Sequence, residues 1–90
     1  MPRIEKELTV RNMQGLHARP AAMIVQTATK FKSEIWLIKD GREVNGKSML
    51  GVMTLAAEMG SVITIRADGP DAQKALEAIA KVFEMRFGER

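Results

Sequence analysis

The chain contains almost none of the residues that build covalent or metal cross-links. It has no cysteine and a single histidine among its 90 residues. Disulfides and thiolate metal sites are therefore excluded, and one imidazole is too few for a histidine-rich metal cluster. We expect a protein without metal or cofactor, and because a chain without disulfides suits a reducing compartment, we place it in the cytoplasm.

Aromatic residues and long apolar runs are also scarce. One tryptophan, three phenylalanines and no tyrosine offer no stacking platform for nucleic-acid bases. Charges recur every few residues in the segment MPRIEKELTVRNM, which leaves no apolar stretch of the length that a signal peptide or a membrane span needs. We therefore expect no membrane insertion.

The net charge of +3 favours acidic partners, and nucleic acid is one of them. The basic residues are nevertheless mixed with acidic ones, as in KALEAIAKVFEMRFGER, and no run of one sign appears. A small basic nucleic-acid-binding domain, whose affinity would fall steeply with salt, is therefore an alternative of another class, and we expect no nucleic-acid partner.

The composition and the apolar pattern predict one folded unit. Ninety residues have room for one modest core, and no repeat or linker divides them, so residues 1–90 are expected to form a single domain. Alternating apolar positions predict strands over residues 3–10 and over SVITIRA. Between them, SEIWLIKDGREV predicts a hairpin that turns at Asp40 and Gly41, because an Asp-Gly pair adopts positive φ easily.

Three helices are predicted, two of them from apolar positions at steps of three and four residues. The first runs from Ala18 to about Phe31, and the second is a short helix that begins after Ser48. The third lies in GPDAQKALEAIAKVFEMRF, with Pro70 in its first turn. The order β-α-β-β-α-β-α predicts an α+β fold: a four-stranded antiparallel sheet with three helices on one face and solvent on the other.

The segment GLHARPA surrounds the only histidine, His17. If a helix begins at Ala18, His17 is its N-cap and the imidazole lies beside the free N–H groups of the first turn. The positive end of the helix disfavours imidazolium, so the ring is neutral and nucleophilic, and the same end attracts an anion. Arg19 can contact phosphate oxygens through both guanidinium branches, while Pro20 stiffens the turn.

This constellation favours phosphoryl transfer that relies on positioning and electrostatics. The simpler interpretation is that His17 is an ordinary cap residue and that Arg19 is a solvated side chain. A small hydrolase is a third interpretation, but it needs a second catalytic partner, and no motif supplies one.

The segment NGKSMLGVM contains a second candidate site. Ser48 has a structural role as the N-cap of the short helix, which also carries Met49, Leu50 and Met53. A helix this short cannot bury all three, although core packing remains the simplest explanation for some of them. Unbranched, polarisable methionines also suit a docking face that must fit several partners.

Together GLHARPA, GKSMLGVMTLA and GSVITIRADGPD resemble the histidine-containing phosphocarrier (HPr) family of the bacterial phosphotransferase system, from about Ile4 to Phe87. The resemblance implies an open-faced β-sandwich in which His17 accepts a phosphoryl group from enzyme I on the ring nitrogen nearer the backbone. It also implies that His17 passes the group to IIA proteins or domains of sugar permeases. It further implies that Arg19 assists that transfer and that Ala18 and Arg19 supply N–H groups. We expect a monomeric carrier and not a turnover enzyme.

The resemblance implies that enzyme I and IIA dock on the short helix and on the region around the histidine. In one branch of the family an ATP-dependent HPr kinase/phosphorylase phosphorylates the serine that matches Ser48, and KSMLGVM looks like that branch. A phosphate there would place about two negative charges beside the docking face and slow the charging of His17. A nitrogen-related regulatory branch with the same chemistry stays open. The terminal RFGER suggests no chemistry.

Overall fold

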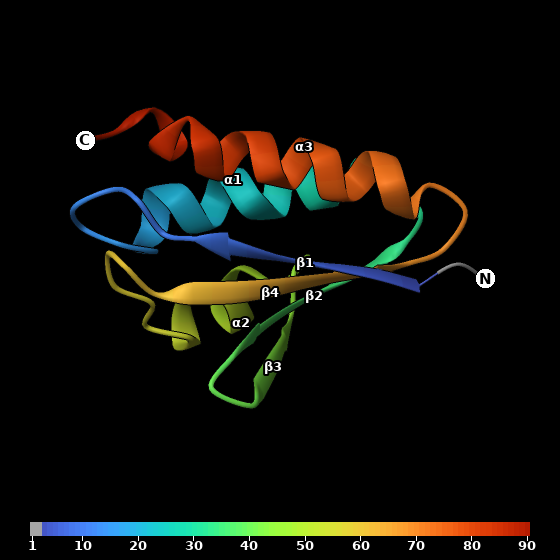
Figure 1. Ribbon diagram of the computed structural model, residues 1–90, viewed down its shortest axis with the longest axis horizontal. Coiled ribbons are helices and arrows are strands. Elements are labelled where there is room, and N and C mark those ends of the chain that lie inside the picture. The colour runs from blue at the N-terminus through green and yellow to red at the C-terminus, as the bar shows by residue number, and fades with distance from the viewer. Residues whose placement is uncertain (1–2) are drawn as a thin grey trace.

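The protein is described by a computed structural model that covers residues 3–90. Its elements follow the predicted order, with one additional 3-10 turn, η1, near the end (Figure 1). In chain order they are β1 (Arg3–Thr9), α1 (Ala18–Ala28), β2 (Glu34–Lys39), β3 (Arg42–Asn45), α2 (Met49–Thr54), β4 (Val62–Asp68), α3 (Ala72–Glu84) and η1 (Arg86–Gly88).

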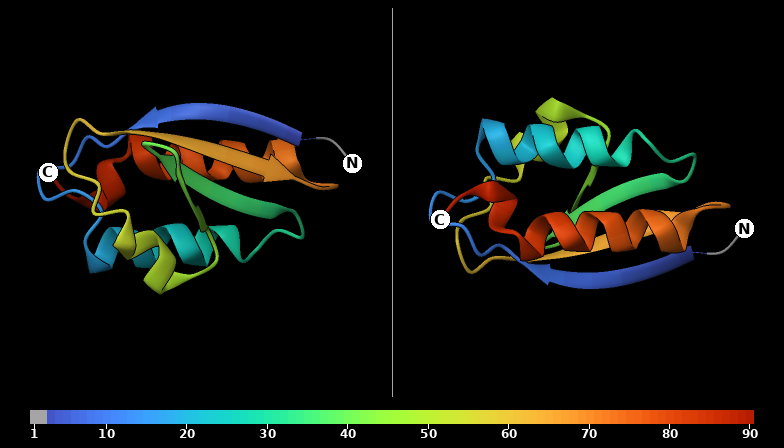
Figure 2. Two further views of the ribbon diagram at one scale, coloured as in Figure 1. Left: turned by 90° about the horizontal axis from the view of Figure 1, so that it is seen from below. Right: turned by 90° about the horizontal axis from the view of Figure 1, so that it is seen from above.

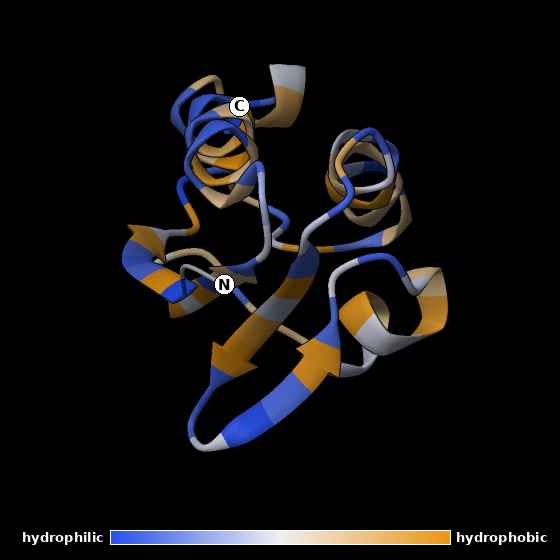
Figure 3. Ribbon diagram, turned by 90° about the vertical axis from the view of Figure 1, so that its right-hand side faces the viewer, coloured by the Kyte–Doolittle hydropathy of each residue, from blue (hydrophilic) through white to orange (hydrophobic). Residues whose placement is uncertain are grey.

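The four strands form one antiparallel sheet in the order β1-β4-β2-β3. The predicted turn between β2 and β3 is confirmed, since Asp40 and Gly41 have φ values of 52° and 80°, as a two-residue hairpin turn requires. α1 and α3 lie next to each other across one face of the sheet, and α2 packs beside α1 and next to β3 (Figures 1 and 3). The α+β class is therefore confirmed.

The core lies between the sheet and the helices. Alternate residues of β4, such as Ile63 and Ile65, are fully buried and share the core with Ile24 of α1 and Ile79 of α3. The opposite face of the sheet is open, and there the Arg66 guanidinium lies 5.9 Å from the centre of the Trp36 ring. In the described part of the chain, no helix has the length and the apolar character to cross a membrane.

The first helix ends at Ala28, about one turn before the predicted end near Phe31. The N–H groups of Lys30 and Phe31 donate to the carbonyls of Thr27 and Ala28 at 3.2 Å, so the chain tightens into turns. Lys47 then donates from Nζ to the Phe31 carbonyl at 2.8 Å. Phe31 thus follows the apolar spacing of α1 although it lies beyond the end of the helix. It packs against the core from a turn.

The third helix begins at Ala72, so the prediction that Pro70 lies in its first turn is wrong. Asp71 is the N-cap residue, and its carboxylate accepts hydrogen bonds from Lys32 N and Ser33 N, both at 2.9 Å, and from the Ser33 hydroxyl. These bonds fix the chain before the helix and leave Pro70 outside it, immediately before the N-cap. They also join the start of α3 to the turn before β2.

The same bonds make stability depend on pH. The Ser33 hydroxyl, followed by the Lys32 N–H, lowers the pKa of Asp71 from 3.8 to about 2. A depressed folded-state pKa gives stability that is complete above the unfolded pKa and is lost as pH falls through the folded one, here from about pH 4 to pH 2.

We expect Asp71→Asn to lower the melting temperature by several degrees at pH 7 and to flatten the pH dependence of stability between pH 4 and 2. Thermal unfolding followed by circular dichroism across that range measures both effects. Asp40→Asn is the matched control, because it removes a carboxylate from an exposed turn that asparagine also tolerates. Equal losses in the two variants would contradict the assignment.

Candidate functional site

The loop that precedes α1 is held against the segment before β4. Val10 N donates to Ser61 O and Leu16 N donates to Ala57 O, both at 2.9 Å. Gly15 has a φ of 71°, and a Cβ atom there would lie 2.2 Å from Ala57 O. Only glycine fits this conformation and this close approach, which explains the first residue of the segment GLHARPA.

His17 is the N-cap of α1, as predicted. Its backbone is extended, with φ −75° and ψ −168°, and its carbonyl accepts the first helical hydrogen bond from Ala21 N at 3.0 Å. The N–H groups of Ala18 and Arg19 precede that bond and are not used by the helix, and Pro20, which is buried, has none. The helix start therefore presents two N–H groups next to His17, while the Arg19 side chain is exposed.

The imidazole does not cap the helix itself. Its Nε2 lies 3.0 Å from Oε1 of Glu89, and the side chains of His17 and Glu89 are 37% and 16% exposed. The hydrogen bond from His17 lowers the pKa of Glu89, and the Asn12 amide and the charge of Arg19 act in the same direction. Because an ionised carboxylate only accepts, Nε2 carries the proton, and a neutral ring presents Nδ1 as its free nucleophilic nitrogen.

Glu89 reaches His17 because the chain turns back after α3. Arg86 and Phe87 have φ values of 54° and 56°, and the Phe87 ring is buried edge-on against Phe83 with centroids 4.9 Å apart. The C-terminal end then lies beside the loop before α1 (Figure 2). The sequence-based view that RFGER carries no chemistry is therefore corrected. Gly88 after an apolar residue signals a helix end, but nothing in the pattern indicates the direction of the turn.

The structure also places a buried asparagine at the site, which the sequence did not single out. Asn12 is fully buried and donates from Nδ2 to Gly15 O at 2.7 Å and to Glu89 Oε1 at 3.1 Å. Next to this contact, Met13, Gln14, Glu89 and Arg90 line a cavity of about 340 Å³. Met13 is 69% exposed and adds an apolar surface beside the site.

The second candidate site begins as predicted, with Ser48 as the N-cap of α2. The Ser48 Oγ accepts a hydrogen bond from Gly51 N at 3.0 Å. Leu50 and Met53 are 75% and 40% exposed, whereas Met49 packs partly against the core. Figure 2 shows α2 beside the N-terminal half of α1, so the helix with these two exposed side chains adjoins the helix that His17 caps.

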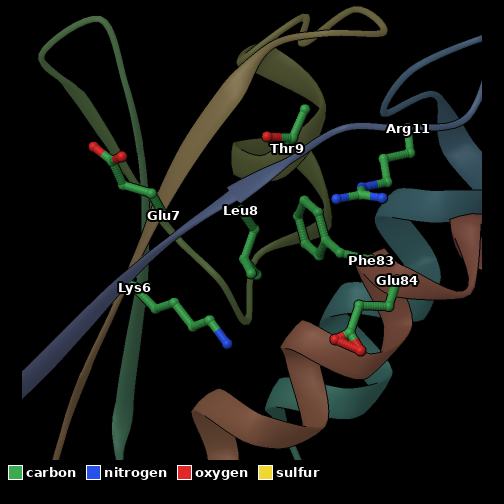
Figure 4. Close-up of a pocket in the computed structure, with 7 residues that line it drawn as sticks. All are labelled: Lys6, Glu7, Leu8, Thr9, Arg11, Phe83 and Glu84. Carbon is green, nitrogen blue, oxygen red and sulfur yellow. The ribbon is translucent and has the colours of Figure 1, made fainter.

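A further groove, of about 250 Å³, lies between β1 and α3 (Figure 4). Leu8 points toward Phe83 at its centre, and charged side chains surround them. Its lining residues are Lys6, Glu7, Leu8, Thr9, Arg11, Phe83 and Glu84, so no residue of the two candidate sites contributes to it.

The fold and the site define the class of the protein: an open-faced β-sandwich with one partly exposed histidine at the start of its first helix. A family profile described as the phosphorylation site of the HPr component of the phosphotransferase system matches residues 4–85. The phosphocarrier protein HPr of Xylella fastidiosa is 54% identical over 86 residues, which cover 96% of this chain and 97% of that protein.

Solved structures agree with this match. An HPr structure from Thermoanaerobacter tengcongensis superposes with a TM-score of 0.93 at 45% identity and covers 97% of this chain and 98% of that one. An HPr dimer from the same organism superposes with a TM-score of 0.78 at 48% identity, covering 89% and 92%. The chain belongs to the HPr family of phosphocarrier proteins of the phosphotransferase system.

The contact between His17 and Glu89 can be tested without any partner. We expect His17→Ala to raise the pKa of Glu89 toward its ordinary value of 4.5, because the hydrogen bond from His17 is the largest cause of the depression. Arg19→Ala should cause a smaller rise, since its charge is a lesser cause. Carbon-13 NMR of the Glu89 carboxyl measures both values. An unchanged Glu89 titration in His17→Ala would show that the contact does not form in solution.

Proposed function

We propose that this chain carries phosphoryl groups between enzyme I and IIA proteins or domains of the phosphoenolpyruvate-dependent phosphotransferase system. In the first transfer, the N–P bond of the phosphohistidine of enzyme I breaks as a new N–P bond forms at Nδ1 of His17. In the second transfer, the N–P bond at His17 breaks as the phosphoryl group passes to IIA. The observation that carries the proposal is the hydrogen bond between His17 Nε2 and Glu89, which leaves Nδ1 as the nucleophile.

The groups around His17 support charge stabilisation during transfer. The Arg19 side chain is exposed, and its guanidinium makes no hydrogen bond or ion pair within residues 3–90, so it is free to turn toward a phosphoryl group. The unused N–H groups of Ala18 and Arg19 add donors at the positive end of α1. The site is shallow, with His17 37% exposed, as a carrier that must release its group requires.

The chain then functions as a carrier and not as a turnover enzyme, and it needs no cofactor. We place it in the cytoplasm as a single domain and as a monomer, although one structural relative is an HPr dimer. The exposed side chains Leu50 and Met53, with Met49 behind them and Met13 near Glu89, form the surface on which enzyme I and IIA dock. Carriers of the nitrogen-related branch would use the same His17 chemistry with other partners.

Ser48 is the second phosphorylation site in this proposal, as a substrate of an HPr kinase/phosphorylase. Its hydroxyl already lies at the start of α2, where negative charge is tolerated. A phosphate there would lie next to Leu50, at the edge of the docking surface. The added charge would repel acidic partners and slow the charging of His17.

The transfer itself gives the first test. Incubation with phosphoenolpyruvate and enzyme I should give a phosphoryl group that is labile to acid and stable to base, and His17→Ala should abolish it. Arg19→Ala should slow transfer about 10- to 100-fold, as expected for the loss of a charge-assisted hydrogen bond. Its melting temperature should stay close to that of the wild type.

Arg3→Ala is the matched control for Arg19→Ala, because Arg3 is an exposed arginine of β1 at the other end of the molecule (Figure 1). Equal slowing in the two variants, or a fall in melting temperature parallel to the loss of transfer, would argue against a role of Arg19 in transfer.

Two substitutions at Ser48 distinguish the effect of negative charge from the effect of losing the N-cap. Ser48→Asp and Ser48→Asn both keep a good N-cap for α2, but only the aspartate adds a negative charge. We expect Ser48→Asp alone to slow charging by enzyme I, measured as the initial rate of phosphoryl incorporation. HPr kinase/phosphorylase with ATP should place an acid-stable phosphate on the wild type and none on Ser48→Ala. Equal charging rates for Ser48→Asp and Ser48→Asn would refute charge-based regulation.

A further inference from the structure

Asn12 occupies an unusual place for an asparagine. It is fully buried, although its neighbours Arg11 and Met13 are exposed and asparagine is mostly a surface residue. We propose that Asn12 is a positioning residue for phosphoryl transfer: its amide holds the Glu89 carboxylate against His17 Nε2 and so presents Nδ1 for attack. This inference rests on the proposed function of His17.

The orientation of the Asn12 amide follows from its partners. The Gly15 carbonyl and the Glu89 carboxylate can only accept hydrogen bonds, so the NH2 group must face both of them, at 2.7 and 3.1 Å. The amide oxygen Oδ1 is then buried, and it accepts no hydrogen bond within residues 3–90. The amide therefore acts on its surroundings through its two donated bonds, to the Gly15 carbonyl and to the Glu89 carboxylate.

The two bonds connect the parts that must be aligned. Gly15 lies two residues before His17, whereas Glu89 is separated from His17 by 72 positions in the sequence. Asn12 Nδ2 and His17 Nε2 lie near the same carboxylate oxygen, Oε1. The amide thus fixes that oxygen relative to the loop from which His17 projects. Without it, a long and flexible glutamate side chain would be held at the ring by a single bond.

Asn12→Asp is the sharpest variant, because it keeps the shape of the side chain and replaces the donor by an acceptor. The new carboxylate would face the Gly15 carbonyl and the Glu89 carboxylate, and its charge would drive Glu89 away from His17. We expect phosphoryl transfer from enzyme I to slow about tenfold, as for other groups that orient a reacting side chain through a neighbour. Nitrogen-15 NMR should show Nδ1 of the neutral His17 ring gaining protonation at the expense of Nε2.

A second substitution distinguishes positioning from a merely structural role. When Asn12→Asp is combined with Glu89→Gln, the glutamine amide can donate to the new carboxylate while its oxygen still accepts from His17 Nε2. We expect this double variant to transfer about as fast as Glu89→Gln alone, so the two substitutions are not additive. Asn12→Ala, which adds no charge, should slow transfer less than Asn12→Asp and shift the nitrogen-15 signals in the same direction.

Asn45→Asp is the control for charge, because Asn45 is exposed at the end of β3 and its Oδ1, which accepts from Lys47 N, is retained. Unchanged transfer and unchanged His17 signals in Asn12→Asp and Asn12→Ala would overturn the inference. So would a loss of transfer rate from Asn12→Asp that is equally large in the wild type and in Glu89→Gln. If the wild type accepts no phosphoryl group, the proposed function fails, but the nitrogen-15 signals still decide whether Asn12 acts on His17.

Discussion

The close approach of the loop before α1 to the Ala57 carbonyl determines where the site lies. Leu16 donates to this carbonyl, and Gly15 passes so near to it that no side chain fits. His17 follows at once and accepts the first hydrogen bond of α1, so the imidazole and the helix start are placed by the same contact. A rigid scaffold thereby holds a partly exposed side chain without enclosing it.

The position of Glu89 in the site depends on a sharp turn of the backbone after α3. Left-handed conformations at Arg86 and Phe87 cost about 1 to 3 kcal/mol each. Burial of the Phe87 ring contributes about 2 to 3 kcal/mol, and its edge-on contact with Phe83 adds about 1 kcal/mol. The corner is thus held by an apolar anchor. Glu89 follows two residues after it, which explains how an exposed chain end keeps a carboxylate at the imidazole.

The sequence predicted what short-range patterns determine. Apolar periodicity located the strands and helices, and the Ser48 cap and the Asp40 turn follow from local chemistry. Pro70 was misplaced because bonds from Ser33, far away in the sequence, selected Asp71 as the cap. Glu89 and Asn12 were missed for the same reason. Their contacts join distant segments through a left-handed corner, and neither propensity nor spacing encodes the direction of such a turn.

The resulting arrangement suits a group that must be accepted and then given away. Strong binding of a phosphoryl group in the ground state would lower the energy of the carrier and raise the barrier to the next transfer. At His17 the fixed bonds act on the imidazole, through Glu89, while the Arg19 guanidinium and two helix N–H groups have no partner within residues 3–90. In the proposed transfer, preorganisation would therefore lie on the nucleophile, and the groups that would meet the phosphoryl are held by no fixed bond within residues 3–90. For the proposed carrier, this division would favour a small difference in free energy between the charged and uncharged forms, so that the partner would determine the direction of transfer.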